Sequence, residues 1–367
     1  MRNDLSIKLY DKNGDLFKVL DRKANVDWAY RNIGGCGQAN LTIENDFDYL
    51  EDSLEPQTSV RVFINNALRY SGKLVEMRRE LIKNSEKIVC SFFGYVVELD
   101  DVIVKKTYEG QSVSDIVTDI MNTFVVPNTN ITFDLSDVDA ASYSVVKLAL
   151  NHTAKDAIQL LGQLAGNFEW GVDRDKAFFF KTIDKVVRNV FLIGKDVSKS
   201  NIMRKDEDVV NVMNVFGSDG SVIIATVQSS LSISKFGRKE ANVFESSINE
   251  LSDANRYGQV LLKNTTNSQR RIKFTAIKED IFLEENVPVG AVALDDGVIR
   301  EKVVYGTVNK YGRNIKYGNL TRDQIAEVRY SVNGGGLMAM IELKRDIPNL
   351  ANQQKQVEFQ IKNVQRR

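Results

Sequence analysis

Few side chains in this sequence could carry out chemistry, and the single histidine, His152, is the first to consider. One histidine cannot supply the His–His pairs that many metal sites use, and any catalytic triad would depend on this residue alone. His152 stands directly before an expected helix, whose N-terminus Asn151 or Thr153 would cap. Because the sequence reveals no nucleophile for it to activate, we interpret His152 as a structural residue.

The acidic motifs favour turns over catalysis. Asp11-Lys12-Asn13-Gly14-Asp15 resembles the opening of a calcium loop, but Arg22 stands where such a loop needs its bidentate glutamate. The adjacent acids Asp100-Asp101 and Asp295-Asp296 would point to opposite faces of a strand, which does not suit the carboxylate pair of a glycoside hydrolase. We therefore predict turns at these positions.

The two cysteines, Cys36 and Cys90, are too few and too differently placed for a disulfide framework or a zinc site, and we expect free thiols. Together with the single histidine, they lead us to expect no catalytic residue, no metal site and no bound cofactor.

Composition limits the classes of partner. Lys and Arg number 49 and Asp and Glu number 49, so the formal net charge is zero and no overall field draws the chain onto nucleic acid or an anionic membrane. The first ten residues lack the apolar run of a signal peptide, and no later stretch approaches the ~18 apolar residues of a membrane-spanning helix. We expect a protein that is made and kept in the cytosol of its producer, or released without the secretory route. Its 367 residues exceed what one hydrophobic core normally serves, so several domains are expected.

The sequence pattern of residues 1–105 predicts strands. Two runs of alternating residues, 6–10 and 16–20, flank an Asn-Gly pair that favours a hairpin turn. Further strands are expected at 39–43, 59–64, 68–78 and 87–97, which predicts a small β-barrel or sandwich.

Residues 106–200 change to an α+β pattern. Ser112 is the expected N-cap of a helix with apolar residues at helical spacing, and a second helix follows His152 and stops near Gly166. A hairpin of 167–173 and 177–181 is expected to pack on that second helix, with Phe178-Phe179-Phe180 as a core strand.

Strand signals return in 201–330, interrupted by a helix near 253–264. Residues 70–76 and 304–310 share a weak likeness, which suggests two related barrels. The expected fold is therefore mainly β, with an α+β insert between two small related, tube-like β-barrels. Residues 331–367 are expected to form a glycine joint, a strand and a C-terminal helix.

The order of these features resembles the baseplate hub or tail-tip hub proteins of tailed bacteriophages and related contractile injection systems. The residues that carry the resemblance are 35–44 and 68–74, then 109–117, 153–161 and 168–173, then 208–217 and 287–290. None of these motifs is specific alone, and their order is what makes the resemblance.

The resemblance implies a structural virion protein at the tail tip or baseplate, assembled in the host cytoplasm, and no enzymatic activity. It implies a homotrimer whose six barrels form a ring between the sixfold tail tube and a threefold spike or fibre. The implied partners are a tail-tube or distal tail protein above, the spike or fibre protein below, and the tape-measure protein. DNA would pass through this ring without specific binding during ejection.

The C-terminal segment offers a candidate trimer interface, because apolar residues there recur in alternating steps of three and four. The seam consists of Ile347, Leu350, Gln354, Val357, Ile361 and Val364. A helix docked on its own chain would show the same short stripe, and the pattern does not separate the two.

Two alternatives remain open. The chain could be another tail component, such as a distal tail adaptor or a receptor-binding subunit. From a different class, it could be a carbohydrate-active enzyme on a β scaffold, which would need a pair of carboxylates facing a cleft.

Overall fold

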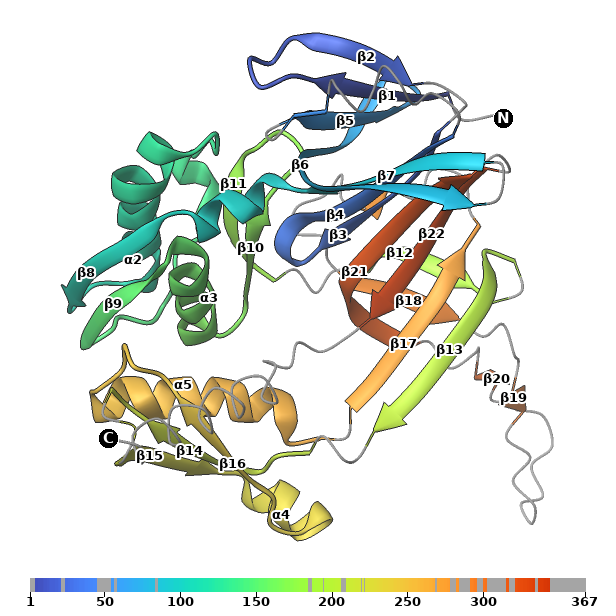
Figure 1. The fold of residues 1–367 in the computed structure, drawn as a ribbon. Helices are drawn as coiled ribbons and strands as arrows, with labels where there is room; N and C mark the ends of the chain where they lie inside the picture. Colours follow the sequence, from blue (N-terminus) through green and yellow to red (C-terminus); the bar gives the residue numbers. More distant parts are fainter. Residues whose placement is uncertain are drawn as a thin grey trace.

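The structure is a computed structural model, and its fold is mainly β with an α+β insert (Figure 1), which confirms the expected fold class. It describes residues 4–20, 24–44, 54–55, 58–82, 85–183, 187–193, 195–205, 209–218, 220, 222–267, 269–277, 282–283, 291–295, 300–301, 315–316, 321–333 and 336–343.

The N-terminal strands begin with the predicted hairpin of β1 (Leu5–Tyr10) and β2 (Leu16–Leu20). In the turn, the Asp11 carboxylate accepts hydrogen bonds from the backbone N–H groups of Asn13 (2.9 Å) and Asp15 (2.8 Å). These bonds, led by that from Asp15, lower the pKa of Asp11. The acidic motif is therefore a hairpin turn, as predicted.

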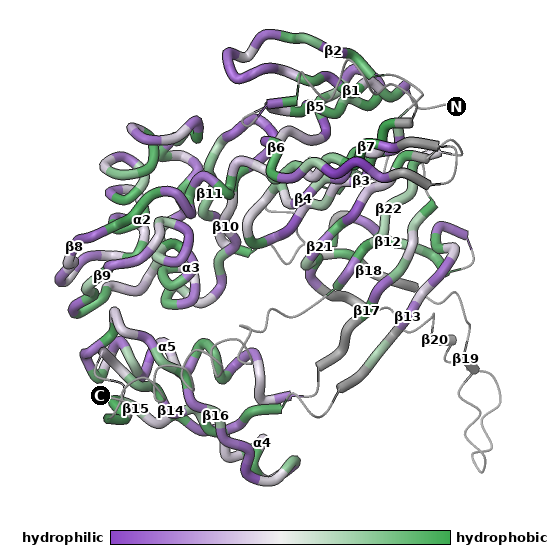
Figure 2. Tube along the Cα trace, viewed as in Figure 1, coloured by the Kyte–Doolittle hydropathy of each residue, from purple (hydrophilic) through white to green (hydrophobic). Residues whose placement is uncertain are grey.

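The strands predicted at 39–43, 59–64 and 68–78 form within β4 (Ile33–Glu44), β5 (Ser59–Ile64) and β6 (Ala67–Ile82). The strand predicted at 87–97 forms as β7 (Ser85–Phe93) but ends at Phe93, and a 3-10 turn follows at Tyr95–Asp100. Strand β3 (Ala24–Arg31) was not predicted from the sequence. Alternating buried and outward-facing side chains explain how these strands pack on the core. Along β5 the side chains of Val60, Val62 and Ile64 are buried, while the intervening residues face outward. Figure 2 shows apolar and polar stretches alternating along the strands.

Strands from the second half of the chain continue the same sheet. They are β12 (Val187–Leu192), β13 (Val197–Lys205), β17 (Gln269–Ala276), β18 (Ala291–Asp295), β21 (Thr321–Asn333) and β22 (Gly336–Leu343). Antiparallel pairing of β21 with β3 joins the two halves, and the main path runs β13-β17-β22-β21-β3-β4-β7-β6-β5-β1-β2. One hydrophobic core serves both halves. We call this part of the molecule the sheet body.

The insert contains the two predicted helices, α2 (Val113–Ile120) and α3 (Ala154–Ala165). Ser112 caps α2 by accepting a hydrogen bond from the Asp115 N–H, and Thr153 caps α3 in the same way from Asp156. Gly166, with φ +90°, ends α3. The strands of the insert are β8 (Ile103–Glu109), β9 (Lys147–Thr153), β10 (Phe168–Val172) and β11 (Phe178–Thr182).

Residues 209–267 form a second α/β layer. It contains β14 (Val212–Phe216), β15 (Ile223–Gln228), α4 (Ser230–Phe236), β16 (Glu240–Phe244) and α5 (Leu251–Thr265). Helix α5 packs on this small sheet so tightly that a Cβ at Gly258 would lie 2.9 Å from the Val227 side chain. The layer shares one hydrophobic core with the insert, and we call residues 95–183 and 209–267 together the α/β body.

This grouping differs from the one expected for residues 201–330, because the strand pattern of 209–217 does not reveal which sheet the strand joins. Of the described residues in 201–330, the end of β13, β17, β18 and the described part of β21 lie in the sheet body, while Arg300–Glu301 and Ile315–Lys316 pair as a separate two-stranded sheet. The boundaries at 105, 200 and 330 stay predictions about separately folding domains.

The two β segments cannot be compared through the sequence likeness at 304–310, since those residues lie outside the described part of the chain. Among the described helices, none is both long and apolar enough to cross a membrane.

Candidate functional site

The residues predicted to form a trimer seam, Ile347 to Val364, lie outside the described residues, so the seam stays a prediction. The described residues instead bring distant segments together at a histidine contact, at the contacts of α5 with the insert, at the junction between the two bodies, and at the β3–β21 pairing.

His152, at the end of β9, contacts a distant turn, and no pattern in the sequence predicts this contact. Its Nε2 lies 2.7 Å from Ser247 Oγ and 3.7 Å from Glu245 Oε1. The residues lie 95 positions apart along the chain. Burial raises the pKa of the Glu245 carboxyl, and a hydrogen bond from the Ser247 N–H opposes that effect.

This contact does not have the arrangement of a catalytic triad. In a triad the acid holds the Nδ1 side of the imidazole, whereas both Ser247 and Glu245 lie on the Nε2 side of His152. Ser247 is also only 1% exposed. The contact fastens β9 of the insert to the second α/β layer, together with a backbone hydrogen bond from Ala149 N to Ser247 O.

Several other candidates have structural positions, while Asp296 lies outside the described residues. Asp100 pairs with Lys155 Nζ at 2.6 Å, and Phe178-Phe179-Phe180 is a buried strand, as predicted. Cys36 and Cys90 are both buried, and burial raises the pKa of the Cys90 thiol to about 12. Within the described ranges, no three His, Cys, Asp or Glu residues gather as metal ligands.

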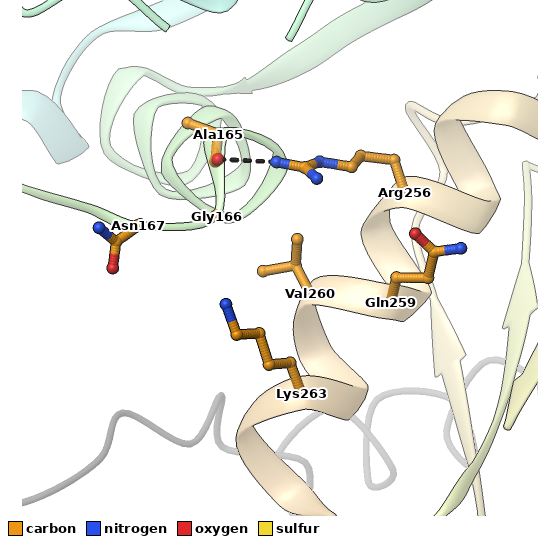
Figure 3. A pocket seen from close by; sticks show the side chains of 7 residues that line it. All are labelled: Ala165, Gly166, Asn167, Arg256, Gln259, Val260 and Lys263. Carbon is orange, nitrogen blue, oxygen red and sulfur yellow. Dashed lines mark hydrogen bonds between the residues drawn. The ribbon is translucent and has the colours of Figure 1, made fainter. Parts of the chain in front are cut away.

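A small pocket of about 240 Å³ lies between the end of α3 and helix α5 (Figure 3). The Arg256 guanidinium at this pocket donates to the carbonyls of Leu164 and Ala165, at 3.0 and 2.9 Å. These are end carbonyls of α3, which lack partners within the helix. Arg256 therefore fastens α5 to the insert.

Asp253, one turn earlier on α5, makes a second connection and is fully buried. Its carboxylate accepts hydrogen bonds from the Tyr143 hydroxyl (2.5 Å) and from the backbone N–H groups of Val146 and Lys147 (both 3.1 Å). A buried carboxylate needs such donors, because burial without them carries a large free-energy cost. The two segments of the α/β body are thus joined by specific polar contacts as well as by their shared core.

The junction between the two bodies is built on glycine. Strand β10 of the insert runs parallel to β4 of the sheet body, with Gly171 opposite Gly34 and Val172 opposite Gly35. A Cβ on Gly171 would lie 2.3 Å from the Gly35 nitrogen, and one on Gly35 would lie 2.2 Å from the Val172 oxygen. No side-chain carbon fits between these backbones.

A second pair of glycines lies at the same junction. A Cβ on Gly94 would lie 2.1 Å from the Cys36 oxygen, and one on Gly72 would lie 2.6 Å from the Phe93 oxygen. The carbonyl of Gly37 accepts hydrogen bonds from the buried Tyr70 hydroxyl (2.9 Å) and the Gly94 N–H (3.0 Å). Three of the motifs behind the sequence resemblance, 35–44, 68–74 and 168–173, therefore meet at this junction.

Charged groups complete the junction. Glu98, from the 3-10 turn Tyr95–Asp100, is 5% exposed and pairs with Lys73 of β6. The same carboxylate accepts hydrogen bonds from the Asn130 backbone (2.6 Å) and side chain (3.1 Å). The Ser71 hydroxyl donates to the Arg174 carbonyl in the β10–β11 turn. The insert is thus held to β6 at two neighbouring points.

The β3–β21 pairing carries a polar network on its outward face. Arg329 donates to Asp27 at 2.9 Å, and Arg31 donates to Glu327 at 2.9 Å, so each arginine meets an acid across the strand pair. Asn40 of β4 extends the network by donating to Asp27 at 3.1 Å. The two halves of the sheet are therefore joined by side-chain contacts whose four charges cancel.

Comparison with known proteins was made by sequence and by structure. No protein-family model matches the chain, and no curated protein sequence matches it. Solved structures do match. The 43 kDa tail protein of prophage MuSo2 from Shewanella oneidensis is 13% identical, with a TM-score of 0.63, over 94% of this chain and 98% of that one.

Two further tail proteins match over similar lengths. A tail protein of Neisseria meningitidis MC58 is 12% identical, with a TM-score of 0.62, over 94% of this chain and 97% of that one. Prophage tail protein gp18 of Listeria monocytogenes EGD-e is 11% identical, with a TM-score of 0.55, over 96% and 99%. Along almost its whole length, this chain has the fold of phage tail proteins, as the order of its sequence motifs predicted.

Proposed function

We propose that the chain is a structural subunit of a phage tail tip or baseplate hub, and not an enzyme. The observation that carries this proposal is the extent of the fold match, which takes in at least 94% of this chain and nearly all of each of three tail proteins. Both the sheet body and the α/β body fall within a match of that length. The proposal of a structural role is therefore an analogy based on fold, since one fold can serve several functions.

The proposed assembly is a homotrimer that joins the sixfold tail tube to a threefold spike or fibre. Two sheet halves per chain would supply six in a trimer, and the β3–β21 pairing supports a fixed spacing between the halves. The proposed partners are a tail-tube or distal tail protein above the ring, a spike or fibre protein below it, and the tape-measure protein. The site of action is the virion tail tip, after assembly in the host cytoplasm.

The ring would also provide a passage for DNA that does not grip it. Each unpaired lysine or arginine facing the passage would add affinity for phosphate and slow the transit. Two observations support such a passage. The chain has no net charge, and on the β3–β21 face each arginine is paired with an acid: Arg31 with Glu327 and Arg329 with Asp27.

Oligomeric mass tests the proposal. We expect the wild-type chain to form a trimer in light scattering, alone or with its tail partners. Replacing Val357 and Ile361 with Asp would place charge in the proposed seam and lower the measured mass. Gln356→Asp with Gln360→Asp is the matched control, because it adds equal charge one residue before each seam position.

The outcomes separate the seam from the function. A trimer that survives V357D/I361D contradicts the seam, whereas a wild-type monomer in the presence of its tail partners contradicts the trimeric hub. Particles made without this protein should lack complete tails in electron micrographs. Release of reducing ends from host cell-wall material by the purified chain would instead support the carbohydrate-active alternative.

A further inference from the structure

Positive charge gathers on the outward face of the N-terminal strands. Antiparallel pairing places Lys8 of β1 directly opposite Arg61 of β5, and their neighbours Ile7, Leu9, Val60 and Val62 are buried in the core. Like charges in directly opposite positions destabilise a sheet. This arrangement therefore works against folding stability.

Two lysines extend the charged surface toward the insert. Lys73 of β6 is paired with Ser59, the residue two positions before Arg61 on the same face. Lys176, in the β10–β11 turn, places its Nζ 4.5 Å from the centre of the Tyr95 ring, and Lys73 Nζ lies 5.8 Å from the same ring. We call Lys8, Arg61, Lys73 and Lys176 the basic stripe.

Aromatic rings support the stripe. Lys8 lies over Phe63 (4.7 Å) and Arg61 lies over Tyr10 (4.5 Å), in addition to the two lysines over Tyr95. A cation over a ring is attracted by the ring's electrons and is partly held in place. Because a cation lies over one face of each ring, that face is not an open platform on which a nucleic-acid base could stack.

The charges of the stripe are only partly balanced. Within the described part of the chain, Glu98 pairs with Lys73, while no ion pair joins Lys8, Arg61 or Lys176 to an acid. Burial lowers the pKa of Lys176, and the nearby Arg61 and Lys73 add to this effect while Glu98 opposes it. Lys176 also adopts φ +69°, an uncommon conformation for a residue other than glycine.

We propose that the basic stripe is a docking site for an acidic segment of a partner protein. Among the described residues, four cations and one acid form a concentrated positive surface on a chain whose net charge is zero. Glu98 shows that the site accepts a carboxylate, since Lys73 and two N–H groups of Asn130 hold it there. A partner's Asp or Glu side chains would offer Lys8, Arg61 and Lys176 the same type of partner.

Nucleic acid is the competing polyanion, and the geometry favours it less. Four cations on three strands and one turn form a short patch, whereas duplex binding draws on many phosphate contacts spread along the backbone. The proposal does not depend on the tail-tip assignment, because it rests on the charges of this face alone.

Binding of a short fluorescein-labelled oligoglutamate peptide to the full-length protein tests the proposal by fluorescence anisotropy. At low salt we expect Arg61→Gln and Lys176→Gln each to weaken binding by roughly fivefold or more, because each removes a charge-assisted contact. Added salt should weaken wild-type binding. Lys235→Gln is the matched control, because Lys235 also lies over a ring (Phe236, 4.9 Å) but belongs to α4.

Each outcome decides the proposal. Thermal unfolding midpoints at or above that of the wild type would show that the variants remain folded, and R61Q should not lower the midpoint because it relieves the like-charge contact with Lys8. The proposal is overturned if the peptide does not bind at low salt, or if K235Q weakens binding as much as R61Q and K176Q do. It is also overturned if a short DNA duplex binds more tightly than the peptide and loses affinity in the same two variants.

Discussion

At the residue scale, the junction between the two bodies requires glycine, because no Cβ atom fits between the two backbones. Gly171 and Gly35 lie far apart in sequence, yet their backbones approach so closely that each excludes a Cβ on the other strand. Gly35 also has φ +72°, so a side chain there would add backbone strain to the steric overlap. At Gly171 the steric overlap is the reason that a side chain does not fit. Gly171 therefore gives the cleaner test.

We expect Gly171→Ala to lower the free energy of unfolding by about 2 kcal/mol or more, since the new carbon meets backbone that cannot rotate away. Gly37→Ala is the matched control, because its Cβ would lie 3.3 Å from the nearest atom, the Ala29 oxygen. Urea unfolding measures both variants. Equal losses would contradict the close approach of β4 and β10.

At the element scale, β9 is fastened to the turn after β16 by His152, Ser247 and Glu245. Burial raises the pKa of the Glu245 carboxyl above its ordinary 4.5. The folded protein therefore holds this proton at pH values where the unfolded chain has released it. The contribution of Glu245 to stability is present below pH ~4.5 and is lost as the pH rises through the raised value.

Glu245→Gln should remove this part of the pH dependence. Glutamine keeps an oxygen that can accept the Ser247 N–H, which donates to Glu245 at 3.1 Å, and it carries no charge to bury. Urea unfolding between about pH 4 and 8 should show wild-type stability falling with pH relative to the variant. A constant difference across that range would mean that Glu245 titrates as it does in the unfolded chain.

At the scale of the whole molecule, the α/β body is one core built from two separate segments. Val215, Tyr257 and Leu261 of the second segment are buried in the same cluster as Ile158 and Leu161 of the insert. The sheet body likewise combines strands from both ends of the chain. Neither body is continuous in sequence.

A fragment of residues 95–183 should therefore fail to fold alone, because it lacks the apolar partners that 209–267 supply. Its amide proton spectrum should show the narrow dispersion of an unfolded chain, or it should bind a hydrophobic dye as a collapsed state does. Adding residues 209–267 through a short linker should restore dispersed signals. A well-dispersed spectrum from the shorter fragment would contradict the shared core.

Local features of this fold could be predicted because they depend on neighbours in sequence. The Asp11 turn, the Ser112 cap and the alternation of β5 each involve residues within a few positions of one another. Backbone geometry, capping and alternation then determine the element with little help from the rest of the chain. The order of such elements was enough to predict the tail-protein fold.

The tertiary structure alone decided which elements pair. Asp27 and Arg329 are 302 residues apart, Tyr143 and Asp253 are 110 apart, and His152 and Ser247 are 95 apart. Strand edges offer the same backbone donors and acceptors to any partner, so the sequence pattern of a strand does not determine which strand it pairs with. Partner choice follows from packing the whole core, which is why residues 209–267 joined the insert and why the charges of the basic stripe met on one face.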